Sequence, residues 1–91
     1  MNALEESRTI INETDEQLVK LFETRFAAVK QILEYKKANH LPVLDAKREA
    51  CLIEKREGEV SEELRPYFRE FYQALLAASR HYQSDHMDDC S

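Results

Sequence analysis

An unbroken amphipathic pattern over the first 38 residues constrains the fold of this chain more than any other feature. Steps of four and three residues, alternating from Leu4 to Lys36, trace a heptad-like seam, which is typical of one long helix with a buried stripe. No proline or glycine precedes Pro42, so the pattern predicts a single helix over about residues 3–38. Six seam positions are apolar, and the other four are Arg8, Asp15, Arg25 and Lys36.

The length of this predicted helix implies a partner chain. A helix of about 35 residues spans roughly 50 Å, whereas a compact chain of 91 residues has a radius of gyration of about 12 Å. The helix would therefore overhang a three-helix monomer, and a two-fold dimer is the simplest way to cover its apolar seam. A kinked helix that folds back on itself is the alternative, but the seam contains no helix breaker.

A loop and a second, shorter helix follow. The loop over residues 39–44 contains Pro42, and Asn39 and Asp45 are suited to cap the helices on either side of it. The second helix should end near Gly58, the single glycine. One glycine and two prolines are too few for the many reversals of a β-rich fold, so the sequence predicts an all-α fold.

A third helix of medium length is expected after Ser61, with Pro66 in its first turn. Its apolar face is continued by two polar residues, Ser79 and Gln83, at core-facing positions. Buried polar side chains need hydrogen-bond partners, so this pair marks either a satisfied interhelical contact or a binding site. Residues 84–91 are polar without a stripe and are expected to form a frayed tail.

The composition excludes several classes of protein. A net charge of −5 argues against nucleic-acid binding through the whole surface, and no apolar run is long enough for a membrane span. Without an apolar leader, the chain is expected to be cytoplasmic. Cys51 is expected in the core and Cys90 in the tail. His81, Asp85, His86 and Cys90 fit no established metal-ligand spacing, so neither a metal nor a cofactor is expected.

The basic residues of the seam can be placed by helix geometry. Arg25 and Lys36 are 11 residues apart, so they share one face about 16 Å apart along the axis and could hold the two ends of a small anion. Arg8 lies about 25 Å from Arg25 along the helix, and it could approach Arg25 only across an antiparallel dimer. Alternatively, each cation snorkels out of an interface or forms a salt bridge there.

Taken together, these residues resemble the all-helical (AroQ-class) chorismate mutase family. The resemblance rests on the intervals between Arg8, Arg25 and Lys36, on the block Pro-Val-x-Asp-x-x-Arg-Glu within residues 41–49, and on the block Ser-Arg-x-x-Gln at residues 79–83. It implies an intertwined two-fold dimer of chains with three helices each, one very long, one short and one medium.

The resemblance also implies a reaction, the concerted Claisen rearrangement of chorismate to prephenate in phenylalanine and tyrosine biosynthesis. This isomerisation needs no nucleophile, metal or general base. It needs the dicarboxylate substrate held in its folded, diaxial form, and it needs stabilisation of the charge that develops as the ether bond breaks.

The resemblance assigns roles to the cationic residues and to one amide. Arg25 and Arg8 of the partner subunit would bind the substrate carboxylates, because arginine can bind a carboxylate through two hydrogen bonds, and Arg48 would support the site. Lys36 and Gln83 would donate to the ether oxygen, where negative charge develops.

The remaining implied residues surround the ring of the substrate. Glu49 would accept a hydrogen bond from the ring hydroxyl, and Asp45 and Ser79 would complete the wall around the ring and its carboxylate. The catalytic residues implied are Lys36, Gln83, Arg25 and Glu49. The full substrate-binding set implied is Arg8, Arg25, Lys36, Asp45, Arg48, Glu49, Ser79 and Gln83.

Two other functions fit parts of the pattern. One is isochorismate pyruvate lyase, an eliminating enzyme on the same fold with a similar cationic site. The other is a non-catalytic helical dimerisation module, in which the seam cations could be replaced by apolar residues. Because the chain ends soon after Gln83, we expect one chorismate mutase domain over residues 1–91 without a fused enzyme.

Overall fold

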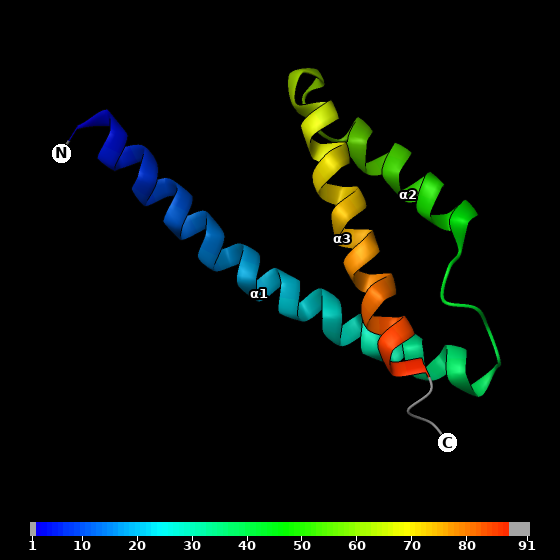
Figure 1. Cartoon of the computed structure of the whole chain (residues 1–91). Coiled ribbons are helices and arrows are strands. Elements are labelled where there is room, and N and C mark those ends of the chain that lie inside the picture. Colours follow the sequence, from blue (N-terminus) through cyan, green and yellow to red (C-terminus); the bar gives the residue numbers. More distant parts are fainter. Residues whose placement is uncertain (1, 88–91) are drawn as a thin grey trace.

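A computed structural model describes residues 2–87 of the chain as helices joined by short connections (Figure 1). The elements in order are α1 (Ala3–Ala38), α2 (Ala46–Gly58), a single 3-10 turn η1 (Glu62–Leu64) and α3 (Arg65–His86). The predicted all-α fold, with one very long, one short and one medium helix, is confirmed.

Side chains at the predicted boundaries start the first two helices. The Asn2 side chain accepts a hydrogen bond from Glu5 N at 2.9 Å, and the Asp45 side chain accepts one from Arg48 N at 3.0 Å. Each cap satisfies one of the backbone N–H groups that the first turn leaves without a partner. Gly58 is the last residue of α2, as predicted, but its φ is not positive, so it keeps the helical conformation.

The end of α1 is closed by backbone hydrogen bonds around His40. Asn39 is the C-cap, as predicted, and His40 adopts a positive φ of 54°. The Leu41 N–H donates to Lys36 O at 2.9 Å and the His40 N–H donates to Lys37 O at 3.4 Å. This bonding pattern is the Schellman motif, which normally places glycine where this chain has histidine. The motif ends α1 and turns the chain at His40.

Two expectations at the third helix need correction. Ser61 precedes η1 rather than α3, and its side chain makes no capping hydrogen bond. Residues 84–86 are helical rather than part of a frayed tail. Helix continuation there needs no apolar stripe, because His86 stacks on Tyr82 with ring centroids 4.3 Å apart and its Nδ1 lies 2.8 Å from Tyr82 O. Cys90 lies outside the described residues.

The core lies where the C-terminal half of α1 meets α3. Among residues 2–87 it consists of four apolar side chains and two polar ones: Val29, Leu33, Tyr72, Leu76, Ser79 and Gln83. The expected burial of Ser79 and Gln83 is therefore confirmed. α2 runs beside α3 (Figure 1) and contributes no fully buried residue. The expectation for Cys51 was wrong, because its side chain is exposed on α2.

The N-terminal half of α1 extends away from α2 and α3 (Figure 1). The chain is 57 Å long with a radius of gyration of 16.7 Å, well above the roughly 12 Å of a compact chain of this length. Four apolar seam residues remain about half exposed in the single chain: Leu4, Ile11, Leu18 and Phe22. The overhang that the sequence predicted is therefore present.

Candidate active site

A buried serine connects α1 to α3 at the first predicted site position. Arg25 on α1 is half-buried, and its Nη1 donates a hydrogen bond to Ser79 Oγ at 2.6 Å. The Ser79 hydroxyl in turn donates to Leu75 O, one turn earlier in α3, at 3.1 Å. The single hydroxyl proton is thereby directed at the backbone, which leaves the oxygen lone pairs for the guanidinium. The Arg25 side chain is thus held against the face of α3.

A second contact between the two helices fixes Lys36 and Gln83. Lys36 Nζ donates to Gln83 Oε1 at 3.1 Å and to Val43 O, in the loop before α2, at 2.8 Å. Gln83 Nε2 donates to Ser79 O at 3.3 Å. Because an ammonium group can only donate, the amide oxygen of Gln83 must face Lys36. One N–H of Gln83 and one N–H of Lys36 are left over from these bonds.

These contacts join the two predicted cations of α1 into one site. Arg25 bonds Ser79, Gln83 bonds the backbone of Ser79, and Lys36 bonds Gln83. The wall they form combines one guanidinium, one ammonium and one amide, all presented from rigid helices. Such a wall suits a ligand that carries carboxylates and an acceptor oxygen.

The start of α2 carries three of the four remaining predicted residues, Asp45, Arg48 and Glu49. Asp45 is engaged as the N-cap, and with Arg48 it lines a hollow of about 470 Å³ on α2. Four more residues line this hollow, two of them lysines: Lys47, Cys51, Leu52 and Lys55. Glu49 points instead toward α3, where its Oε1 accepts a hydrogen bond from Arg80 Nη1. The side of α2 that carries Arg48 is therefore cationic, whereas the Glu49 carboxylate is directed at α3.

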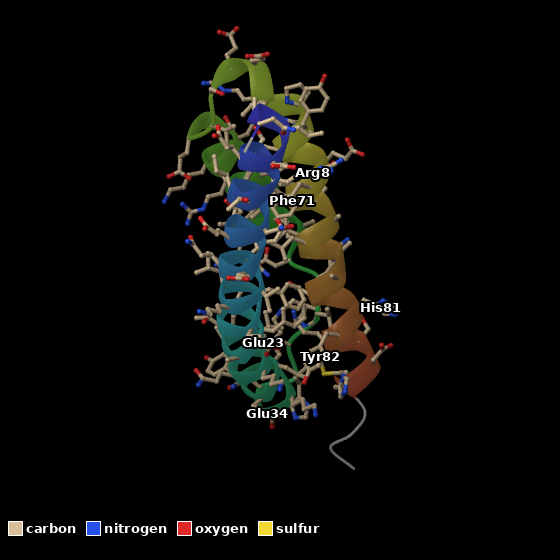
Figure 2. The ribbon with its side chains drawn as sticks, turned by 90° about the vertical axis from the view of Figure 1, so that its left-hand side faces the viewer. Arg8, Glu23, Glu34, Phe71, His81 and Tyr82 are labelled. Atoms are coloured by element: carbon tan, nitrogen blue, oxygen red, sulfur yellow. The ribbon has the colours of Figure 1, made fainter. Side chains whose placement is uncertain are left out.

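Arg8 is not brought to this wall. It is exposed near the N-terminal end of α1, and it lies toward the opposite end of the molecule from Tyr82, the neighbour of Gln83 (Figure 2). The structure thus groups the predicted residues of α1 and α3 on one wall with the start of α2 beside it, and leaves Arg8 on the overhang.

Sequence reasoning missed two contributors to the site. Val43 acts through its backbone carbonyl, which no side-chain pattern reveals. Arg80 lies inside the block that suggested the family, yet no role followed from its position. The sequence shows acidic residues on the other helices, but it does not indicate which of them Arg80 pairs with.

The described residues offer no metal centre. Between residues 2 and 87, no group of three or more His, Cys, Asp or Glu side chains is arranged to hold a metal ion. His81 instead lies with its Nε2 3.5 Å from Asp85 Oδ2, and Figure 2 shows it directed away from the helices. None of the described helices combines the length and the apolar run needed to cross a membrane.

The described residues thus form an all-helical chain with cationic and amide donors fixed on facing helices, and such a set of donors suits an oxygen-rich anion. The chain belongs to the chorismate mutase type II family, which its sequence matches over residues 7–84. This match covers most of the chain and includes every predicted site residue. The family supports a chorismate mutase function rather than the lyase or a purely structural role. Comparisons with curated proteins and with solved structures give no significant match.

Proposed function

We propose that this chain, as one chorismate mutase domain, converts chorismate to prephenate in aromatic amino-acid biosynthesis. The observation that carries the proposal is the pair of donors at Lys36 and Gln83, which are locked together at 3.1 Å beside the buried Ser79. Family membership supplies the substrate, and the donor pair supplies a reason why the rearrangement would be accelerated.

The ether oxygen of the substrate would take the two unused donors. Lys36 has three N–H groups and uses two, while the Gln83 amide has two and uses one. An oxygen in front of the pair could therefore accept one hydrogen bond from each side chain. Negative charge develops on that oxygen as the C–O bond breaks, so both bonds would strengthen in the transition state.

The carboxylates of the substrate would be held by arginines. Arg25 is held against α3 by Ser79 and could bind one carboxylate, with Arg48 supporting it from α2. Arg8 of the partner subunit would bind the other, because Arg8 is too far along the helix to serve its own site. Holding both carboxylates would favour the folded form of the substrate that can rearrange.

Three further residues would enclose the ring. Glu49 would accept a hydrogen bond from the ring hydroxyl, since a carboxylate is the natural acceptor for it. Asp45 and Ser79 would complete the wall around the ring and its carboxylate. Glu49 is only 20% exposed, which supports a role inside the site rather than on the surface.

This arrangement requires a two-fold dimer, and the surface of the single chain favours one. The accessible surface of the single chain is 7366 Å², whereas a compact monomer of this mass exposes about 5,500 Å². The exposed seam of α1 is apolar, so a second copy of the chain is its natural cover. An antiparallel pairing would bring each Arg8 to the other chain's site. The cytoplasmic location stays a prediction of the sequence.

The direct test is turnover. Purified protein is incubated with chorismate, prephenate is quantified, and the oligomeric state is measured by analytical ultracentrifugation on the same sample. We expect prephenate to form and the protein to sediment as a dimer. A parallel incubation with isochorismate should release no pyruvate. A folded dimer that leaves chorismate unchanged would refute the proposal.

A further inference from the structure

The ion pair between Glu49 and Arg80 joins α2 to α3 next to the candidate site. Arg80 Nη1 donates to Glu49 Oε1, and the two side chains are 34% and 20% exposed. Arg80 directly follows the buried Ser79, and Glu49 directly follows Arg48, so each partner is the sequence neighbour of a site residue. The pair is therefore partly shielded from solvent and attached to both sides of the site.

The hydrogen bond occupies only half of the carboxylate. A carboxylate has two oxygens and about four acceptor positions, so Glu49 Oε2 stays available to a hydroxyl when Oε1 is bound to Arg80. A glutamate has three rotatable side-chain bonds, and a charge-assisted hydrogen bond at one oxygen fixes the direction of the other. Arg80 thus has the geometry to aim Glu49.

We propose that Arg80 is a positioning residue that orients Glu49 to accept the ring hydroxyl of the substrate. The inference rests on the proposed chorismate mutase function and adds to it a residue that makes no contact with the reacting atoms. Arg80 acts through Glu49 alone, so its removal loosens the grip on the ring hydroxyl. That hydroxyl keeps its bond in both the ground state and the transition state, so the loss falls on KM rather than on kcat.

The same two helices contain a matched control pair. Glu57 Oε2 accepts from Arg69 Nε at 2.9 Å and from Arg69 Nη2 at 2.5 Å, near the connection between α2 and α3 and away from the site. Glu57 is 20% exposed, as is Glu49. Both pairs tie α2 to α3, but only Glu49–Arg80 adjoins site residues. If the Glu49–Arg80 pair only braced the two helices, breaking either pair should therefore have the same effect on KM.

The test compares kcat and KM for chorismate in wild type, Arg80→Met and Arg69→Met, with folding checked by circular dichroism and thermal unfolding. We expect Arg80→Met to raise KM by about tenfold, which corresponds to the loss of about one typical hydrogen bond, and to change kcat less than about twofold. Arg69→Met should leave both parameters unchanged. Arg80→Lys, which keeps the charge and a donor, should recover most of the lost affinity.

Further measurements distinguish the orientation of Glu49 by Arg80 from a general tie between α2 and α3. In a Glu49→Ala background, Arg80→Met should add no further rise in KM, because the residue through which it acts is gone. If Arg80→Met does not fold, Arg80→Leu is measured instead, with the same expected rise. Suppose that wild type converts chorismate but that Arg80→Met has an unchanged KM, or that Arg69→Met raises KM as much as Arg80→Met does. Either result would overturn this inference and leave the proposed function standing. Wild-type protein without turnover would instead refute the proposed function, and this inference with it.

Discussion

Lys36 Nζ lies 3.1 Å from Gln83 Oε1, and this contact fixes the orientation of the Gln83 amide. The lysine is held from its other side by Val43 O at 2.8 Å. With the amide oxygen turned to Lys36, the amide nitrogen must point along α3, where it reaches Ser79 O. Both residues are therefore set as donors before any ligand arrives, which is the arrangement that favours electrostatic catalysis.

Replacing Lys36 by alanine should reduce turnover more than other lysine changes on the same helix. The substitution removes one donor to the developing oxyanion and also releases the Gln83 amide, so we expect kcat to fall by more than about 10²-fold. The exposed Lys30 on α1 is the matched control, and Lys30→Ala should keep wild-type kcat. A near-wild-type rate in Lys36→Ala would contradict the assigned role.

The pH profile should depend on the side chain at position 83. An amide donates at any pH, so we expect wild-type activity to be maintained between about pH 5 and pH 7. In Gln83→Glu only the protonated acid can donate to the ether oxygen, and glutamic acid ordinarily titrates near pH 4.3. The variant should therefore be most active at acid pH and lose activity as the pH rises. A wild-type profile that falls sharply across this range would argue against Gln83 as the donor.

The sequence was sufficient for the parts of the site that follow helix periodicity. Arg25 and Lys36 could be placed on one face because the helical repeat fixes the spacing of residues, and Ser79 and Gln83 stood out as polar residues on an apolar stripe. Contacts set by how helices approach one another could not be predicted. The bond from Lys36 to the Val43 carbonyl depends on the path of a loop.

The same limit explains the missed ion pair and the misplaced cysteine. Glu49 and Arg80 meet because of the angle at which α2 crosses α3, and that angle depends on packing rather than on local sequence. Cys51 was expected in the core because free cysteines are usually buried, but it lies on the exposed side of α2. Side-chain type alone does not identify which side of a short amphipathic helix packs.

Replacing His40 by glycine should stabilise the protein. His40 has a φ of 54°, a conformation that costs a residue with a Cβ about 1 kcal/mol and costs glycine almost nothing. We expect the midpoint of thermal unfolding to rise in His40→Gly at fixed protein concentration. His40→Ala keeps the Cβ and should show little gain, and His40→Val should be destabilised. If alanine and glycine stabilise equally, the positive φ is not the cause.

The assignment of Arg8 to the partner's site predicts complementation between two inactive variants. Homodimers of Arg8→Ala and of Lys36→Ala should each have very low activity. In a mixed dimer, the Arg8→Ala chain keeps its own Lys36 and receives Arg8 from the Lys36→Ala chain, so one of the two sites is complete. Random assortment of equal amounts makes half of the dimers mixed and should restore about a quarter of wild-type activity.

The control for complementation is the double variant, Arg8→Ala with Lys36→Ala, mixed with either single variant. No mixed dimer then contains a complete site, so activity should stay at the level of the inactive homodimers. The chains must be unfolded and refolded together, because exchange between folded dimers with a long shared helix would be slow. If Arg8 served its own chain, every site in the first mixture would lack one residue and no activity would return. Recovery thus depends on α1 reaching both sites, and the 17-residue interval between Arg8 and Arg25 gives the helix about 25 Å with which to do so.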